Sequence, residues 1–406
     1  MAKVVPFRAI RPSRDKVSLL ASRSYLSYSK EILLEKLENN PYTFLHIINP
    51  NYSARYEVNS YVEKFKLVKE KFKSYIKEGI FQKDNSNSFY IYQKNNEDGN
   101  SFIGIIGAAY VIDYQNGKIK IHEQTIPKRE ELFKTYLQTT GFNAEPVLLT
   151  YPNHICIDEI IQRYRQTRAE YEFTTTNKSQ HKLWLVNDEN DIQLIERSFS
   201  EIENLYIADG HHRFASSSLL AKKSNNSNTQ YCMSFLIAED QIKITSFNRL
   251  LKNLNGLSDE DFLTQIKVKY EVKEVQKALA PNQKDEITLY ISKKWYSLIA
   301  KEEYVNRTHC VEKLDPAILS NNILAPILGI TDPRNDKRLS FINGTHSLKE
   351  IKHKVDSKEF KAAFILKPIS VNQIKEVADK GQSMPPKSTY IQPKLRSGML
   401  IYDFEE

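Results

Sequence analysis

Five consecutive residues near the middle of the chain combine side chains that are suited to phosphate chemistry. They are Asp209, Gly210, His211, His212 and Arg213. The apolar run 204–208 before them predicts a short buried strand, and the pattern over 214–221 predicts a helix that begins at or just after Gly210. A helix start presents backbone N–H donors and the positive end of the helix dipole. The expected ligand of this turn is therefore an anion.

The side chains of this turn suggest separate roles. Arg213 and the amides of the turn, Gly210 included, would hold phosphate, while Asp209 would bind a metal ion or accept a hydroxyl proton. His211 and His212 point about 100° apart once the helix has begun, so they cannot face one ligand equally. The alternative is structural: Asp209 as an N-cap, Gly210 as a turn residue and the histidines as polar fillers. An N-cap needs one such residue only, so we favour the functional interpretation.

Two further segments carry candidate residues. His122 and Glu123 lie at the end of a predicted strand, where Glu123 could act as a catalytic base toward the acceptor and His122 as a hydrogen-bond donor to phosphate. An exposed strand end explains the same two residues equally well. Lys387 and Ser388 follow two prolines and could bring an ammonium group to the site from a rigid loop. The chemistry of that segment alone favours a plain turn.

Composition describes an ordinary globular chain. Its 406 residues are 40% hydrophobic and 11% aromatic, which allows two or three domains. The net charge of +8 comes from 58 Lys and Arg against 50 Asp and Glu, and it is mixed along helix faces. Because no basic run alternates with aromatic residues, a nucleic-acid partner is not expected. The longest apolar run, 102–112, is too short for a membrane helix, so no membrane partner is expected either.

The cysteines and the first residues of the chain bear on its compartment. Cys156, Cys232 and Cys310 are odd in number, far apart and without the paired spacing of a zinc site. They indicate a reducing compartment. The first residues lack the apolar core of a signal peptide. We therefore expect a cytoplasmic protein, and no set of metal ligands can be identified from the sequence.

Alternating hydrophobic patterns predict an α+β fold with mixed sheets. We expect an N-terminal domain, 1–256, that carries the 122–125 and 209–213 motifs, and a smaller C-terminal α+β domain, 257–406, that begins where Ser258 caps a helix. The expected helices are 29–39, 61–76, 127–137, 157–164, 191–202 and one from 258. The expected strands include 44–48, 88–93, 146–151 and 231–238. Expected hairpins are 101–114 with 119–123, 170–176 with 181–187, 286–304 and 389–404, and Thr125 is a candidate cap.

Five motifs, in order, resemble those of the domain-of-unknown-function 1015 family, whose members carry an Ala-Asp-Gly-His-His-Arg motif. They lie at 5–12, 44–46, 122–125, 207–213 and 384–389. The resemblance covers almost the whole chain, and it adds Arg249, Lys387 and Ser388 to the expected phosphate-binding residues. The sequence departs from the family pattern at 22–26 and at Phe247, where many relatives have His.

The turn itself is similar to the strand, glycine turn and helix that bind nucleotide phosphate in ParB and sulfiredoxin-like domains. One branch of that superfamily consists of free-serine kinases that use ADP. The resemblance implies phosphoryl transfer to a small alcohol, with L-serine as the leading acceptor and ADP or ATP as the donor. Mg²⁺ is expected because carboxylates and phosphates usually meet through a divalent ion.

Two other functions stay open on the sequence. One is a non-catalytic ParB-like regulator that binds nucleotide or nucleic acid, and the other is hydrolysis of a phosphomonoester at the same turn. The chain contains no Walker-type phosphate loop, no dinucleotide fingerprint, no serine-hydrolase elbow and no zinc-protease helix. No cysteine lies in the turn, which disfavours sulfinic acid reduction. The sequence does not indicate an oligomeric state.

Overall fold

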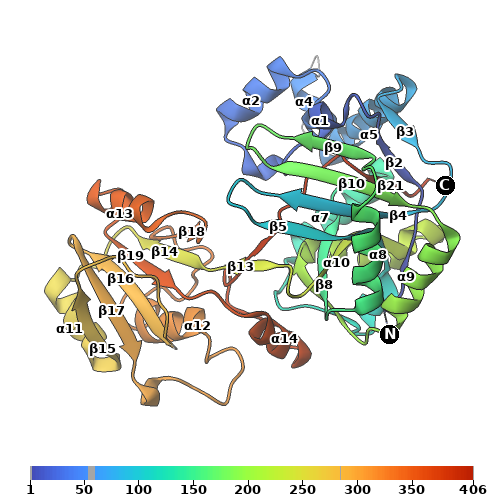
Figure 1. Ribbon diagram of the computed structural model, residues 1–406. Coiled ribbons are helices and arrows are strands. Elements are labelled where there is room, and N and C mark those ends of the chain that lie inside the picture. The colour runs from blue at the N-terminus through green and yellow to red at the C-terminus, as the bar shows by residue number, and fades with distance from the viewer. Residues whose placement is uncertain (1, 54–59, 284, 406) are drawn as a thin grey trace. The chain divides into compact units, whose positions relative to one another are not determined.

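The computed structural model describes residues 2–53, 60–283 and 285–405 (Figure 1). Its contacts divide the chain into two units that are both discontinuous in sequence. Unit 1 is Met1–Ile121, Thr125–Ile242 and Pro393–Glu406, and unit 2 is His122–Gln124 and Lys243–Gln392. The chain thus leaves unit 1 after residue 242 and returns to it at residue 393. The division into domains 1–256 and 257–406 remains a prediction.

A mixed nine-stranded sheet forms the centre of unit 1. The strand order is β6-β11-β8-β12-β5-β4-β10-β9, with β1 paired to β5. β11 runs antiparallel to β8 and parallel to β6, and β12 runs parallel to β8. The strands are β1 (Val4–Val5), β4 (Phe89–Asn95), β5 (Ser101–Tyr110), β6 (Ile119–Lys120), β8 (Val147–Tyr151), β9 (Tyr171–Thr174), β10 (Gln180–Val186), β11 (Leu205–Asp209) and β12 (Tyr231–Ala238).

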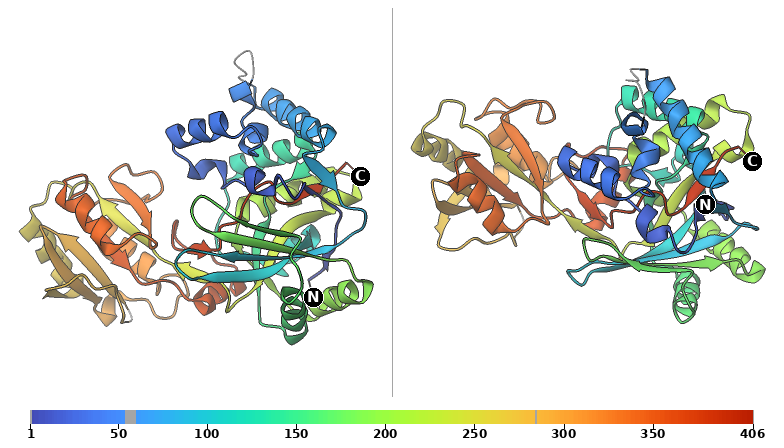
Figure 2. Two further views of the ribbon diagram at one scale, coloured as in Figure 1. Left: turned by 45° about the horizontal axis from the view of Figure 1, so that its top comes forward. Right: turned by 90° about the horizontal axis from the view of Figure 1, so that it is seen from above.

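Helices and a smaller sheet surround these strands. The smaller sheet has the order β3-β2-β21-β7, from Phe81–Lys83, Ala9–Pro12, Ile401–Asp403 and Phe142–Asn143. Both views in Figure 2 place α5 and α8 on opposite sides of the long strands β4, β5 and β10. The α-helices are α1 (Val17–Leu20), α2 (Lys30–Asn39), α3 (Leu45–Ile48), α4 (Pro50–Ser53), α5 (Tyr61–Lys77), α6 (Val111–Gln115), α7 (Pro127–Thr140), α8 (Ile155–Arg165), α9 (Glu189–Glu201) and α10 (His211–Lys223). Helix α10, which carries the motif, packs against α7.

Unit 2 contains an antiparallel six-stranded sheet of order β15-β17-β16-β19-β14-β18. The strands are β14 (Phe247–Leu251), β15 (Tyr270–Val275), β16 (Glu286–Ile291), β17 (Lys294–Ala300), β18 (Leu339–Asn343) and β19 (Ala362–Leu366). Buried residues alternate between two cores along these strands. One core includes α11 (Asp259–Lys269) and α12 (Asp315–Leu319), and the other includes α13 (Leu348–Asp356). A separate ribbon pairs β13 (Lys243–Thr245) with β20 (Tyr390–Gln392), and α14 (Val371–Asp379) precedes β20 in sequence.

The expected α+β class is confirmed, as are most local elements. Ser258 caps α11 through a 3.1 Å bond from the Asp261 N–H to the Ser258 hydroxyl. The hairpins β9–β10 and β16–β17 form as expected. No helix within the described residues is long and apolar enough to cross a membrane.

Three expected strand segments are wrong. Within the expected strand 44–48, Leu45–Ile48 form α3 and Phe44 occupies its N-cap position, because a short, mostly apolar run fits a buried helical turn equally well. The expected hairpin of 101–114 with 119–123 does not form: β5 ends at Tyr110, α6 follows, and β6 pairs with β11. Gly117, with φ +74°, follows the end of α6 rather than forming a hairpin turn. The third, 389–404, contains β20 and β21 (Ile401–Asp403), which do not pair with each other. β20 pairs with β13, and β21 pairs with β2 and β7.

The expected cap at Thr125 is also wrong. Ile126 occupies the N-cap position of α7 without a side-chain bond, while the Thr125 hydroxyl donates to the Glu130 carboxylate. Pro127 at the first helical position lacks an N–H, so this helix start needs one capping bond fewer.

Candidate functional site

A strand, a glycine turn and a helix form the core of the site in unit 1. β11 ends at Asp209, and α10 begins at His211, directly after the turn as expected. Gly210, between them, has φ +97°, a left-handed conformation that residues with a Cβ adopt only at a cost. The turn therefore depends on glycine.

The guanidinium of Arg213 folds back over this turn. Its Nη2 donates to Oδ2 of Asp209 at 2.8 Å, and its Nη1 donates to the carbonyl of Pro146 at 3.0 Å. Nη1 also lies 3.5 Å from Oε2 of Glu145. A Cβ on Gly210 would lie 2.9 Å from both Nε and Nη2 of Arg213. Gly210 thus provides both the backbone conformation and the space that the guanidinium occupies.

Two lysines that the sequence analysis missed complete the cluster. Nζ of Lys394 pairs with Oδ1 of Asp209, and Nζ of Lys94 donates to the backbone carbonyl of Lys394 at 3.0 Å. Lys394 lies 185 positions from Asp209, so no local pattern connects the two. Lys94 leaves little signal in the sequence either, because it stands between Gln93 and Asn95 at the polar end of β4.

Lys94 is buried among like charges. Its residue is 9% exposed, and burial followed by the charge of Arg396 lowers its pKa to about 8, with Lys394 acting in the same direction. Within residues 2–53, 60–283 and 285–405, no carboxylate forms an ion pair with Lys94; only Asp98 attracts it from a distance. A buried charge is costly unless it is paired. An anion at this place would offset that cost.

Asp209 and His211 differ in their charge at neutral pH. Burial raises the pKa of Asp209, but Lys394 and Arg213 outweigh it, so the pKa lies below its ordinary value. Asp209 is therefore ionised at neutral pH, and although protein surrounds it closely, 34% of its side-chain surface stays accessible. Burial lowers the pKa of His211 to about 4, so this 5%-exposed imidazole is neutral at pH 7. The structure also shows the carbonyl of His212 accepting a bond from the Ser216 hydroxyl at 2.6 Å.

The other five predicted site residues belong to unit 2. The carbonyl of His122 accepts the N–H of Met384 at 2.8 Å, so the bend that contains His122 and Glu123 lies beside the 384–388 loop. His122 is buried, whereas Glu123 is partly exposed. Ser388 is buried, and its hydroxyl donates to the Pro385 carbonyl at 2.7 Å, which closes a turn. The bend at 122–123 lies outside β6, so the expected strand end is wrong.

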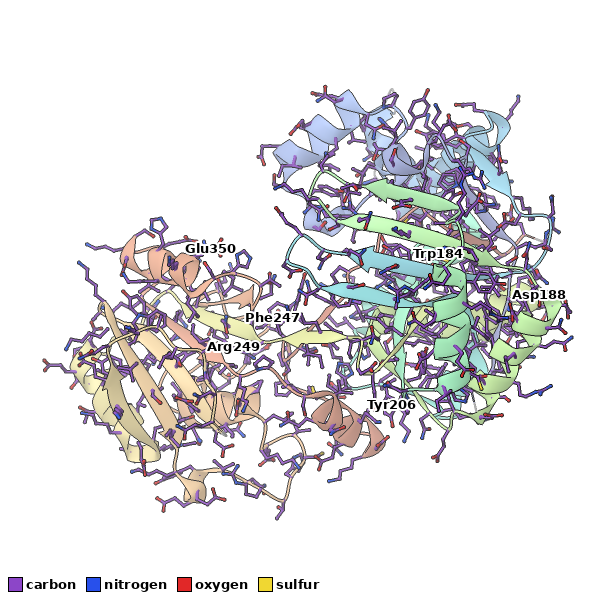
Figure 3. All side chains as sticks on the ribbon, in the orientation of Figure 1. Trp184, Asp188, Tyr206, Phe247, Arg249 and Glu350 are labelled. Atoms are coloured by element: carbon purple, nitrogen blue, oxygen red, sulfur yellow. The ribbon has the colours of Figure 1, made fainter. Side chains whose placement is uncertain are left out.

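Arg249 and Lys387 both contact Phe247 in this unit (Figure 3 labels Phe247 and Arg249). Nη1 of Arg249 donates to the Phe247 carbonyl, and Nζ of Lys387 lies 5.1 Å from the Phe247 ring centroid. Arg249 is 2% exposed and lies over the Phe341 ring, and burial lowers its pKa to about 9. No described carboxylate pairs with Arg249, so it remains a buried cation at neutral pH that an anion would stabilise.

The donor set near Asp209 suits an anion better than a bare metal ion. Both Asp209 oxygens already accept bonds from cations. In the part of the chain that the structure describes, no group of three or more His, Cys, Asp or Glu residues is placed to hold a metal. Mg²⁺ therefore stays a prediction, as an ion that would arrive with the phosphates of a nucleotide.

Several solved structures resemble this chain at low identity. A conserved hypothetical protein from Pyrococcus furiosus has 16% identity and a TM-score of 0.36, with 71% of this chain and 93% of that chain covered. SbnI from Staphylococcus aureus has 15% identity and a TM-score of 0.39, covering 72% and 85%. A free serine kinase in complex with AMP has 15% identity and a TM-score of 0.35, covering 70% and 88%. At these values the likeness concerns the α+β fold only.

The comparison with protein families is more direct. No curated protein matches the chain. The family described as "Protein of unknown function (DUF1015)" matches residues 4–317, which is more than half of the sequence. The match spans both the strand-turn-helix site of unit 1 and Arg249 of unit 2. The chain therefore belongs to the DUF1015 family.

Proposed function

We propose that this protein is a nucleotide-dependent phosphotransferase that acts on a small hydroxyl substrate, with free L-serine as the leading acceptor and ADP or ATP as the donor. The observation that carries the proposal is the cluster of cations at the start of α10. Arg213 and Lys394 pair with Asp209 there. The buried Lys94 donates to the backbone of Lys394, and Arg396 lies close enough to lower the pKa of Lys94. The acceptor itself comes only from the resemblance of the turn to free-serine kinases.

In the proposed reaction the hydroxyl oxygen of the acceptor attacks the terminal phosphorus of the donor. A new P–O bond forms while the bond to the leaving phosphate oxygen breaks, which releases AMP from ADP or ADP from ATP, and the hydroxyl proton passes to a base. Arg213, Lys394 and Lys94 would hold the negative charge of the transferred group. Mg²⁺, if bound with the phosphates, would neutralise further charge.

We assign different roles to Asp209 and His211. Asp209 accepts bonds from two cations and has a lowered pKa, so we assign it to orienting the phosphate-binding cations and the acceptor hydroxyl. We assign His211, which is neutral at pH 7, to accepting the hydroxyl proton. Glu123 as a base, and His122, Arg249, Lys387 and Ser388 as phosphate-binding groups, stay predictions that separate substitutions will test.

Phosphorus NMR tests this function. The purified protein is incubated with Mg²⁺ and L-serine and, separately, with ADP, ATP and pyrophosphate. We expect a phosphoserine signal with one donor, loss of that signal in Lys394→Met, and no loss in the control Lys178→Met, which alters an exposed lysine of the same unit. Release of inorganic phosphate without phosphoserine would instead indicate a hydrolase.

A second candidate is a non-catalytic nucleotide-binding regulator. The pairing of both Asp209 oxygens with cations favours it, because this carboxylate is a weak base in the described structure. This candidate predicts saturable ADP or ATP binding in calorimetry, weakened by Lys394→Met, with no donor consumed by the folded protein.

A further inference from the structure

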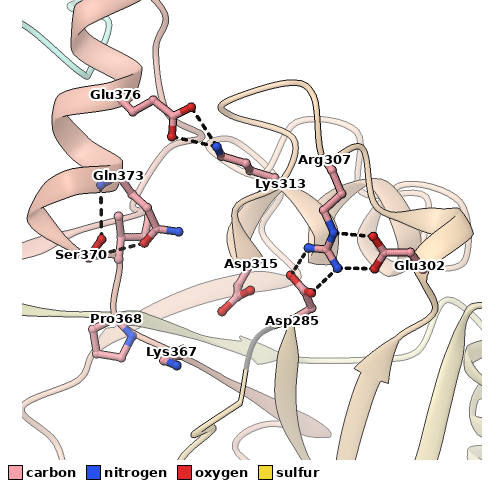
Figure 4. Close-up of a pocket in the computed structure, with 11 residues that line it drawn as sticks. Asp285, Glu302, Arg307, Lys313, Asp315, Lys367, Pro368, Ser370, Gln373 and Glu376 are labelled. Atoms are coloured by element: carbon pink, nitrogen blue, oxygen red, sulfur yellow. Dashed lines mark hydrogen bonds and ion pairs between the residues drawn. The ribbon is translucent and has the colours of Figure 1, made fainter.

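Unit 2 contains a cavity of about 720 Å³ that none of the motifs reaches (Figure 4). Its walls come from the start of β16, the 302–315 segment, the chain after β19 and the first turns of α14. The lining residues that matter here are charged: Asp285, Glu302, Arg307, Lys313, Asp315, Lys367 and Glu376. The volume falls in the ordinary range of small-molecule sites, roughly 300–1,000 Å³.

Most of these charges neutralise one another within the wall. Arg307 donates to both oxygens of Asp285, at 2.8 and 2.5 Å, and also to Glu302 at 2.8 Å. Lys313 donates to Glu376 at 2.8 Å. These pairs, drawn as dashed lines in Figure 4, give the cavity a fixed polar frame.

Two charged groups are exceptions. The carboxylate of Asp315 forms no hydrogen bond or ion pair with any described residue, and Nζ of Lys367 donates only to the backbone carbonyl of Asn282, at 3.0 Å. Burial and then the charge of Asp285 raise the pKa of Asp315 to about 7, against the opposing effects of Lys367 and Arg307. A partly buried carboxylate without a partner destabilises the fold, which is typical of a group kept for binding.

Asp315 and Lys367, the two exceptions, come from different segments of the wall. Lys367 lies just before α14, a nine-residue helix whose capping box is formed by Ser370 and Gln373. The positive end of this helix dipole adds to the charge of Lys367 and favours an anionic group there. Asp315, the first residue of α12, offers a negative group to a cation.

We propose that this cavity binds a small zwitterion, with the ammonium group of the ligand at Asp315 and its carboxylate at Lys367 near the start of α14. The inference uses only unit 2 and does not depend on the phosphotransferase activity. Because an ammonium ligand pairs with the ionised carboxylate, affinity rises with pH through the pKa of Asp315. The titratable and charged groups that line the cavity with Asp315 are Asp285, Glu302, Glu376, Arg307, Lys313 and Lys367.

Calorimetry on the full chain tests the proposal with three zwitterions of increasing charge separation: L-alanine, 4-aminobutyrate and 6-aminohexanoate. None of them carries a hydroxyl group, so none can accept a phosphoryl group, and their binding is separable from the proposed reaction. We expect at least one to bind, about tenfold more tightly at pH 8 than at pH 6, since a group with a pKa near 7 is about tenfold more ionised at the higher pH. Propylamine and propionate, which carry one charge each, should bind at least tenfold more weakly.

Variants assign the two ends of the ligand. Asp315→Asn should remove the pH dependence and weaken binding at least tenfold, and Lys367→Met should weaken it at least tenfold without removing the pH dependence. Lys294→Met, which alters an exposed lysine of the same unit, should change neither. The proposal is overturned if none of the three zwitterions binds to the folded protein, if propylamine binds as tightly as the best of them, or if Lys367→Met has no effect.

Discussion

Replacing Gly210 by alanine tests the position of Arg213 most directly. The new Cβ would lie 2.9 Å from Nε and Nη2 of Arg213, and the backbone has φ +97°. Gly79 offers a matched control in the same unit, because its φ is +72° and a Cβ there would meet nothing within 4 Å. Both substitutions carry the left-handed penalty, and only Gly210→Ala displaces the guanidinium.

The size of each effect follows from these contacts. An alanine in the left-handed region costs about 1–2 kcal/mol, so both variants should lose about that much free energy of unfolding. The guanidinium is the flexible end of a side chain and can swing aside, and its bond to Asp209 is partly solvated, which adds less than about 1 kcal/mol. The stabilities of the two variants should therefore differ by less than about 1 kcal/mol.

Ligand binding should separate the two variants clearly. A charge-assisted hydrogen bond contributes about 1.5–3 kcal/mol, so loss of Arg213 from the phosphate should weaken ADP or ATP binding about 10- to 100-fold in Gly210→Ala. Urea unfolding measures the stabilities, and calorimetry with each nucleotide measures the affinities. If Gly210→Ala binds nucleotide as Gly79→Ala does, Arg213 does not contact the phosphate and the proposed geometry is wrong.

Three further predictions concern single side chains. Asp209→Asn should abolish phosphoserine formation in phosphorus NMR while the protein stays folded by circular dichroism, and an unchanged rate would refute its role. His211→Gln should remove part of the acid sensitivity of the fold. The pKa of His211 is lowered to about 4, so between pH values of about 6.5 and 4 the imidazole binds a proton in the unfolded chain but not in the folded one. The wild type should therefore lose up to about 3 kcal/mol of unfolding free energy as the pH falls through this range. Urea midpoints at pH 7, 5.5 and 4 give this slope for both proteins, and equal slopes would contradict it. Arg249→Met should raise the unfolding temperature, because it removes a buried charge without an ionic partner that destabilises the fold by about 1 kcal/mol or more. Added phosphate should stabilise the wild type but not the variant.

Local sequence patterns predicted much of the fold. The strand before Asp209, the turn at Gly210 and the helix after it depend on residues that are adjacent in the chain, and so does the cap at Ser258. The prediction of a strand at 44–48 was wrong because burial, which the sequence pattern does not reveal, favours a helical turn there. The prediction of a hairpin within 101–123 was wrong because its Asn-Gly pair follows the short helix α6. The end of a helix favours a left-handed glycine just as a hairpin turn does.

The candidate site was only half predictable. Asp209, Gly210 and Arg213 come together through one helical turn, as the sequence indicated. Lys394 reaches Asp209 through tertiary packing, and Lys94 reaches the backbone of Lys394 in the same way, so no spacing in the sequence connects these residues. Lys94 stands between Gln93 and Asn95, as a lysine at an ordinary polar strand end would, and its burial depends on neighbours that only the structure supplies.

The ribbon of β13 and β20 has a consequence for how the gene could be divided. Lys243 lies opposite Gln392 in this antiparallel ladder, so the chain enters and leaves unit 2 at neighbouring points. Antiparallel partners lie about 5 Å apart, a gap that a few residues can bridge. A shortened gene in which a glycine-serine linker replaces residues 243–392 would therefore retain Lys394, and closing the shorter loop costs less entropy. Residues 243–392 are in this sense a cassette, and the cation cluster around Asp209 could be expressed without them, with residues 122–124 of unit 2 kept in the shortened chain.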